Sequence, residues 1–274
     1  MTWTQEQLTE RLAISTAIFQ KFQLGEQHIA KISEAGIPKI ELSVITNSLD
    51  YHNHAQVAEL KRACQSHNIE VTSVHGPFKL PYNTADEDVR KKVVEESYIA
   101  IQFAAEMGAS VYVAHFGFLD HGYKTVTELL GRTQDLNIIL TTENQTNQPF
   151  EPYIKIVDNI ASDRFGMIID IGHARDDDGI NPFVKHDVAR QRLAQCGSRV
   201  KHVHLHETFD LDKKPDHRPP MHKNGIIEWG EVFAALSDIN YASDFVFEDG
   251  RGEDPDEWIQ HTADFPTAFL ERYG

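Results

Sequence analysis

The sequence predicts an α/β fold, a single (β/α)8 TIM barrel that spans residues 1–274 as one domain. Short apolar runs typical of strands alternate with segments of helical apolar spacing along the whole chain. The apolar runs are nearly continuous, as in parallel strands buried on both faces. No linker or low-complexity segment interrupts the alternation. A doubly wound sheet is the alternative, but no Gly-x-Gly-x-x-Gly motif follows any expected strand.

The first half of the chain contains four expected strands and three expected helices. Glycine follows two of the helical segments directly, as at many helix ends, and the third strand is rich in β-branched residues. In order, we expect a strand over 12–18, a helix over 26–35 ended by Gly36, a strand over 37–44, a helix over 54–67, a strand over 69–75, a helix over 86–107 ended by Gly108, and a strand over 110–115.

The second half continues the same alternation. Four further apolar runs are separated by segments with apolar residues at helical spacing. In order, we expect a strand over 137–143, a helix over 153–161, a strand over 166–170, a helix over 187–195, a strand over 200–205, a helix over 229–236, a strand over 244–248, and a closing helix over 256–272.

Metal-binding types of side chain stand at the ends of seven expected strands. In a barrel the carboxyl ends of all strands open onto one face, where active sites lie. A single such residue is more often capped or solvated, but seven consecutive strands end this way, and buried carboxylates repel unless a cation lies between them. The residues, in chain order, are Glu41, His75, His115, Glu143, Asp170, His204 and Glu248.

Four of these residues form the ligand set that we expect for one divalent ion. Glu143, Asp170, His204 and Glu248 end the last four strands and offer three carboxylates and one imidazole. Hard oxygen ligands with one imidazole suit Mn²⁺, Zn²⁺ or Mg²⁺. His173 lies three residues beyond Asp170 and is a further ligand, a group that orients Asp170, a substrate contact, or simply a loop histidine.

Composition restricts the class of protein. A hydrophobic fraction of 41% with 25% charged residues is ordinary for a soluble globular chain. No apolar run approaches the ~20 residues of a membrane span, the N-terminus lacks signal-peptide features, and Cys64 and Cys196 lack metal-site spacing. We therefore expect a reduced, cytoplasmic protein with no membrane partner. A formal charge of −16 opposes binding to nucleic acid.

Several motifs, taken together, resemble the xylose isomerase-like TIM-barrel superfamily. The resemblance is to its sugar phosphate isomerases and epimerases and to their relative endonuclease IV, and it covers almost the whole chain. It rests on Ile40-Glu41-Leu42, Val74-His75-Gly76-Pro77, Ala114-His115-Phe116-Gly117, Thr142-Glu143-Asn144, Asp170-Ile171-Gly172-His173, His202-Val203-His204-Leu205-His206-Glu207, Gly225-Ile226-Ile227-Glu228-Trp229 and Phe247-Glu248.

The resemblance implies isomerisation or epimerisation of a sugar, a sugar phosphate or a related hydroxy-carbonyl compound. One divalent ion, Mn²⁺ or Zn²⁺ with Mg²⁺ or Co²⁺ as alternatives, stabilises an enediolate, and Glu143 and Glu248 move the substrate proton. His173 is expected to hold a substrate oxygen, and the resemblance is compatible with a homo-oligomer, a dimer or a tetramer. Residues expected near the substrate are Glu41, Asn144, Glu207, His217 and His222.

Endonuclease IV provides the competing interpretation, a multi-metal phosphodiesterase. There, residues matching His75 and His115 join Glu143 on a second metal, and those matching His173 and an Asp-x-His sequence hold a third. Here Asp216 and His217 are adjacent, which does not reproduce that chelating geometry, and no ketose-epimerase arginine stands in residues 208–211. A sugar-directed lyase or dehydratase, or a barrel that binds ligand without turnover, are further alternatives.

Overall fold

The structure is a computed structural model that describes residues 3–44, 48–117, 120–144, 148–209, 217–248 and 253–274. In these residues, parallel strands pair in chain order and close into a barrel, which confirms the predicted fold class. The strands are β1 (Leu12–Ser15), β2 (Lys39–Ser43), β3 (Glu70–His75), β4 (Val111–Ala114), β5 (Ile139–Glu143), β6 (Phe165–Asp170), β7 (Val200–Leu205) and β8 (Phe245–Phe247).

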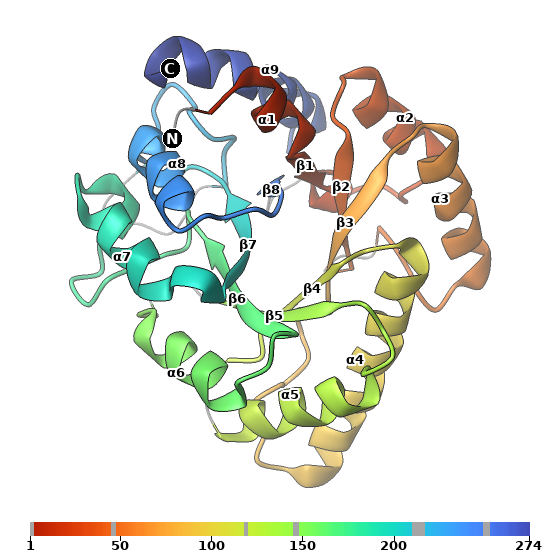
Figure 1. The fold of residues 1–274 in the computed structure, drawn as a ribbon. Coiled ribbons are helices and arrows are strands. Elements are labelled where there is room, and N and C mark those ends of the chain that lie inside the picture. Colours follow the sequence, from red (N-terminus) through yellow and green to blue (C-terminus); the bar gives the residue numbers. More distant parts are fainter. Residues whose placement is uncertain (1–2, 45–47, 118–119, 145–147, 210–216, 249–252) are drawn as a thin grey trace.

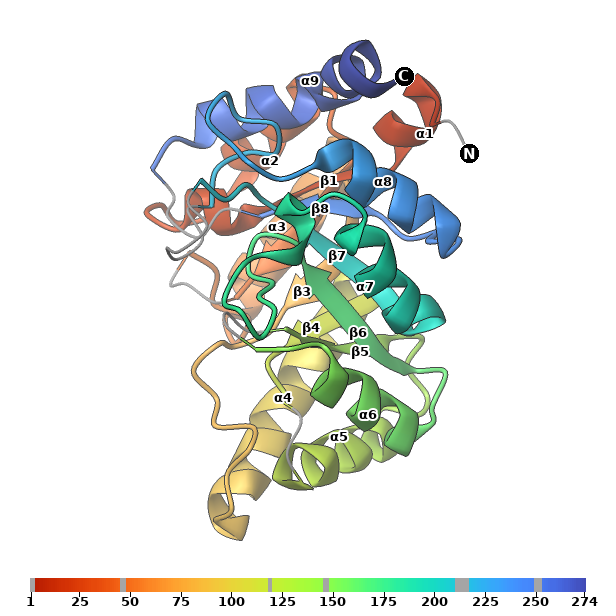
Figure 2. The same ribbon diagram turned by 90° about the vertical axis from the view of Figure 1, so that its left-hand side faces the viewer.

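Helices surround the barrel on the outside (Figure 1). The α-helices are α1 (Gln5–Glu10), α2 (Glu26–Glu34), α3 (His54–Ser66), α4 (Glu87–Met107), α5 (Asp120–Arg132), α6 (Glu151–Ile160), α7 (Val188–Cys196), α8 (Trp229–Asp238) and α9 (Pro255–Tyr273). Short 3-10 helices add η1 (Thr16–Phe19), η2 (Pro182–Val184) and η3 (Gly197–Arg199). Figure 2, the view from the side, shows α1 beside the C-terminal end of α9, so both chain ends lie on one side of the barrel.

Apolar side chains fill two separate spaces. The large core between strands and helices includes fully buried aromatic residues such as Trp229, while Val111, Val113 and Ile168 form a small separate cluster. Val111 and Val113 alternate along β4 with Tyr112, which belongs to the large core. Because neighbouring residues of a strand face opposite sides, the small cluster lies inside the barrel. No described helix is long and apolar enough to cross a membrane.

The structure corrects the expected elements in three places. The first strand ends at Ser15, not at residue 18, because the Ser15 side chain accepts a hydrogen bond from the Ala17 N–H and begins η1. Helix α1 was not expected, although Thr4 and Gln7 form a capping box at its start. Helix α5 was also missed, since its glycines and threonines have low helix propensity, and packing of buried residues such as Val126 helps to stabilise it.

Candidate active site

Three histidines of β7 and the residues after it illustrate how the barrel gathers polar side chains. His202, His204 and His206 are spaced by two residues, so their side chains share one face of the strand. That face is the barrel interior, since His202 Nε2 lies 3.1 Å from Ser73 Oγ of β3. Strand alternation thus places successive histidines at increasing height along the inside of the barrel.

The four expected metal ligands meet at the carboxyl end of the barrel. Glu143, Asp170, His204 and Glu248 each offer one ligand atom, and these atoms all lie within 4.8 Å of one another. His204 Nδ1 is 3.5 Å from Glu143 Oε1 and 3.2 Å from Glu248 Oε2. Asp170 and His204 are register partners on β6 and β7. All four side chains are buried. We call these four residues the quartet.

The donor set of the quartet fits a cation. His204 Nδ1 is buried, faces the carboxylates of Glu143 and Glu248, and makes no hydrogen bond of normal geometry with the described residues. Buried carboxylates at such close range are costly unless positive charge lies between them. A divalent ion would accept the lone pair of His204 Nδ1 and offset the negative charge of the carboxylates, so the donor set suits a divalent cation.

Histidines on the far side of Glu143 provide a second set of donors. His75 Nε2 lies 3.1 Å and His115 Nε2 3.3 Å from the same oxygen, Glu143 Oε2. His75 Nδ1 lies 3.2 Å from the carbonyl oxygen of Gly76. Burial by itself would lower the pKa of His75, but Glu143 raises it, so a protonated His75 can donate from both ring nitrogens. Burial lowers the pKa of His115 to about 4, so this imidazole is neutral near pH 7. His75 and His115, the two residues expected at a second metal, therefore both face Glu143 Oε2, an atom of the quartet.

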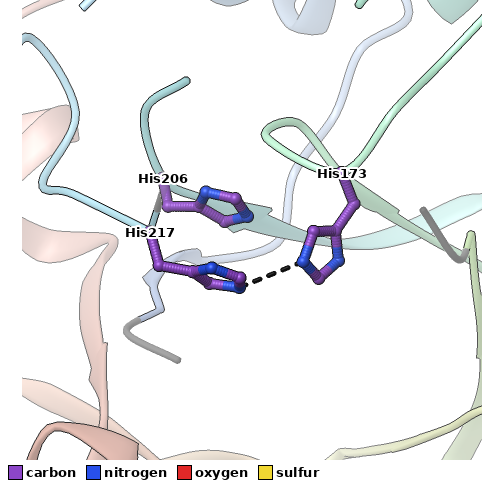
Figure 3. Close-up of side chains that lie close together, drawn as sticks. All are labelled: His173, His206 and His217. Atoms are coloured by element: carbon purple, nitrogen blue, oxygen red, sulfur yellow. Dashed lines mark hydrogen bonds between the residues drawn. The ribbon is translucent and has the colours of Figure 1, made fainter. Parts of the chain in front are cut away.

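A cluster of three histidines adjoins the quartet at Asp170 (Figure 3). His173 Nε2 is 3.0 Å from His217 Nε2, and the His206 ring stacks on that of His217 with centroids 4.1 Å apart. Asp170 lies between two of them, with Oδ2 2.7 Å from His173 Nδ1 and Oδ1 2.9 Å from His206 Nε2. His217 thus reaches His173 despite its altered spacing, whereas Asp216 lies outside the described residues.

Electrostatics couple this cluster to the quartet. Burial by itself would raise the pKa of Asp170, but His173 and His206 hold it well below its ordinary value. Burial by itself would lower the pKa of His173, but Asp170 raises it to about 9. In the protein without metal, the protonated His173 imidazole therefore supplies positive charge beside the buried carboxylates.

Known proteins share this architecture. The family model described as "Xylose isomerase-like TIM barrel" matches residues 29–269, a range that covers most of the chain and all of the quartet. The chain belongs to this family. The resemblance expected from the sequence motifs is thereby confirmed.

Individual relatives of this xylose isomerase-like barrel are distant. The uncharacterized protein MJ1311 of Methanocaldococcus jannaschii is 27% identical over 254 residues, which cover 85% of this chain and 82% of that protein. A D-tagatose 3-epimerase-like protein is 23% identical, with a TM-score of 0.75 and coverage of 96% of each chain. D-Psicose 3-epimerase from Clostridium cellulolyticum H10 is 15% identical, with a TM-score of 0.73 and coverage of 95% of this chain and 98% of that one. These structural similarities establish a shared fold.

Two residues expected at the substrate contact the protein instead. The Asn144 side chain accepts from the Asp170 N–H at 2.8 Å and donates to the Asp170 carbonyl at 3.1 Å. Glu41 is fully buried, and its Oε2 lies 3.0 Å from His204 Nε2, on the opposite edge of that ring from Glu143 and Glu248. The polar atoms of both side chains thus contact residues of the quartet, which does not support substrate contact.

Glu207 has an unusually complete set of hydrogen-bond donors. Its Oε1 accepts from the backbone N–H groups of Thr208, Ile226 and Ile227, and its Oε2 accepts from Met221 N–H and the Trp229 indole. A side chain at Gly225 would overlap Glu207, because a Cβ there would lie 2.1 Å from its Cδ. Burial raises the pKa of Glu207, and the donors oppose that rise. The carboxylate therefore organises its loop, and no oxygen remains available for substrate.

His222 lies apart from the quartet. Its Nε2 is 3.9 Å from Glu257, and its ring contacts those of Phe209 and His261. The structure thus brings together the quartet, His75, His115, His173 and His217. It adds His206 and His202, to which no role was assigned from the sequence, although their two-residue spacing with His204 was a usable signal.

Proposed function

We propose that the chain is a metal-dependent isomerase or epimerase of a sugar, a sugar phosphate or a related hydroxy-carbonyl compound. The observation that carries this proposal is the placement of two buried glutamates, Glu143 and Glu248, 3.5 and 3.2 Å from His204 Nδ1. Membership of the xylose isomerase-like family, and the shared fold of enzymes named for D-psicose and D-tagatose, support the class of substrate.

The quartet would hold the ion, Mn²⁺ or Zn²⁺, with Mg²⁺ or Co²⁺ as alternatives. When bound, it supplies Lewis-acid polarisation of a carbonyl and a neighbouring hydroxyl. Glu143 or Glu248 removes the proton from the carbon beside the carbonyl, and the other glutamate returns a proton. The two glutamates come from β5 and the end of β8, so the substrate carbon lies between carboxylates that approach from different strands. Return at the opposite face gives epimerisation.

His173 would hold a substrate oxygen at the rim. Its side chain is 18% exposed, more than any member of the quartet, and Asp170 lies 2.7 Å from its Nδ1. The carboxylate orients the ring, and Nε2, which lies 3.0 Å from His217, is the ring nitrogen that would contact a substrate oxygen. His173 therefore combines accessibility with a fixed orientation, as a substrate-binding histidine requires.

Solvent-deuterium exchange tests the assignment of the two glutamates. The protein is incubated with Mn²⁺ and D-psicose or D-tagatose in deuterium oxide, and deuterium at the carbon beside the carbonyl is measured by NMR. We expect exchange in the wild type and a loss of at least about 100-fold in Glu143→Gln and Glu248→Gln. Glu228→Gln, at an exposed position before α8, is the matched control. Retained exchange in both active-site variants contradicts the assignment.

An endonuclease IV-like phosphodiesterase is the second candidate, favoured by the additional histidines. His75 and His115 meet at Glu143 Oε2, and His173, His206 and His217 form a further group with metal-ligand geometry. The formal charge of −16 opposes approach to a phosphate backbone. Metal content per chain and nicking of abasic DNA distinguish the candidates: three zinc ions with nicking support the nuclease, and one exchangeable Mn²⁺ without nicking supports the isomerase.

A sugar-directed lyase or dehydratase would use the same proton abstraction. Its product, however, lacks the elements of water or is a shorter carbonyl compound, whereas an isomerase or epimerase conserves the mass of the substrate. Mass spectrometry of the incubated sugar separates these reactions, and an unchanged mass with a new stereoisomer supports the favoured one.

A further inference from the structure

A second polar layer lies inside the barrel, next to the quartet and deeper along the strands. It consists of Glu41 of β2, Ser73 of β3 and His202 of β7, and all three side chains are fully buried. Glu41 Oε2 accepts a hydrogen bond from Ser73 Oγ at 2.8 Å, and His202 Nε2 lies 3.1 Å from the same hydroxyl. We call these three residues the lower layer.

Such a layer is costly in this place. Branched apolar residues normally fill the interior of a (β/α)8 barrel. Here Val111, Val113 and Ile168 occupy such positions. A buried carboxylate loses its hydration and recovers it only through close partners. Moreover, Glu41 Oε1 and His202 Nδ1 have no hydrogen-bond partner among the described residues. Packing by itself therefore gives no reason for a carboxylate at residue 41.

His204 connects the lower layer to the quartet. Its Nε2 lies 3.0 Å from Glu41 Oε2, while its Nδ1 faces Glu143 and Glu248 at 3.5 and 3.2 Å. The two ring nitrogens thus point to different layers. A proton held on Nε2 by Glu41 leaves the lone pair on Nδ1, which is the atom that faces the quartet.

We propose that Glu41 is a positioning residue that fixes the tautomer and ring orientation of His204, so that Nδ1 rather than Nε2 binds the divalent ion. This inference rests on the metal centre of the proposed function. It also explains the lower layer, because Ser73 fixes the position of Glu41 Oε2 by donating to it, and His202 in turn holds the Ser73 hydroxyl. Carboxylate partners of this kind raise the basicity of a ligand histidine.

Mn²⁺ binding tests the proposal without reference to turnover. Electron paramagnetic resonance of free Mn²⁺ gives the dissociation constant, and pulsed measurements at substoichiometric Mn²⁺ detect coupling to an imidazole nitrogen. We expect Glu41→Ala to weaken binding by about 10- to 100-fold and to lose or alter the nitrogen coupling. Glu41→Gln retains an oxygen that can accept the Nε2 proton, so it should keep the coupling with a smaller loss of affinity.

A matched control separates positioning from general stability. Asp244→Asn removes another carboxylate inside the fold, which pairs with Lys39 at 2.7 Å and is not part of the quartet or the lower layer. Asp244→Asn should lower the melting temperature and leave the Mn²⁺ dissociation constant unchanged within about twofold. The Glu41 variants should instead weaken Mn²⁺ binding by more than a loss of stability explains.

The outcomes are decisive. Unchanged Mn²⁺ affinity and unchanged nitrogen coupling in both Glu41 variants overturn the proposal. If Glu41→Ala does not fold, the Mn²⁺ affinity and nitrogen coupling of Glu41→Gln and Ser73→Ala decide instead. Wild-type protein that binds Mn²⁺ without nitrogen coupling also overturns it, and wild-type protein that binds no Mn²⁺ overturns both this inference and the metal centre. Wild-type binding with coupling but no conversion of any sugar refutes the proposed function alone.

Discussion

Asn144 and Asp170 are joined by two hydrogen bonds between a side chain and a backbone. The Asn144 amide oxygen accepts from the Asp170 N–H at 2.8 Å, and the amide nitrogen donates to the Asp170 carbonyl at 3.1 Å. Because Asn144 directly follows the quartet residue Glu143, this pair fixes the separation of two proposed metal-ligand positions on neighbouring strands. The buried amide acts as a clamp across the top of β5 and β6.

Replacement of Asn144 by Ala should therefore loosen the quartet. The backbone N–H and carbonyl of Asp170 would lose their partners in a buried position, at a cost of about 1–3 kcal/mol in the free energy of unfolding. We also expect weaker Mn²⁺ binding by calorimetry. Asn159→Ala, on the exposed side of α6, is the control and should change stability by less than about 0.5 kcal/mol. Equal stability of the two variants would contradict the clamp.

Gly172 permits the close approach of His206. A Cβ at residue 172 would lie 1.9 Å from His206 Cε1, so Gly172→Ala must displace the ring from Asp170 and His217. We expect a loss of about 1–3 kcal/mol by chemical denaturation. Gly131→Ala in α5 has nothing within 4 Å of the added methyl group and should stabilise the protein by up to about 1 kcal/mol. A similar gain at both glycines would refute the steric argument.

Glu207 should be the residue on which the loop before α8 depends. Glu207→Gln replaces one acceptor oxygen by an amino group that faces N–H donors, so at least two buried donors lose their partner. The expected loss is about 2–4 kcal/mol. Native-state hydrogen exchange should accelerate at the amides of Ile226 and Ile227. The neighbouring Glu228→Gln, which is exposed, should leave exchange at those amides unchanged.

The two cysteines should be inert in the folded protein. Burial raises the pKa of Cys64 to about 11 and that of Cys196 to about 12, from an ordinary value of 9.0. At about pH 8 neither thiol should react with Ellman's reagent until the protein unfolds. Since the folded pKa exceeds the unfolded value, the stability contribution is present below about pH 9 and is lost as the pH rises toward 11. Rapid reaction of a folded sample would disprove this prediction.

The sequence by itself determined the barrel and the residues at the carboxyl ends of its strands. Strand alternation decides which side chains share a face, and parallel strands bring their carboxyl ends to one rim. The four residues of the quartet could therefore be assigned to one site from the sequence alone. The same rule would have identified His202 and His206. Helix α1 was missed although Thr4 and Gln7 are a local capping signal, whereas α5 has a weak local signal and is stabilised by packing that no short window contains.

Only the tertiary structure decided what the polar residues near the rim contact. Glu41 and Asn144 were expected at the substrate, yet both support quartet residues from neighbouring strands. Glu207 instead accepts hydrogen bonds from backbone N–H groups up to 20 residues away in the chain and from the Trp229 indole, 22 residues away. His217 reaches His173 across 44 residues. Strand periodicity fixes a face, but it does not fix the path of a loop or the distance between side chains on different strands; those depend on barrel closure and on hydrogen bonds between segments remote in sequence.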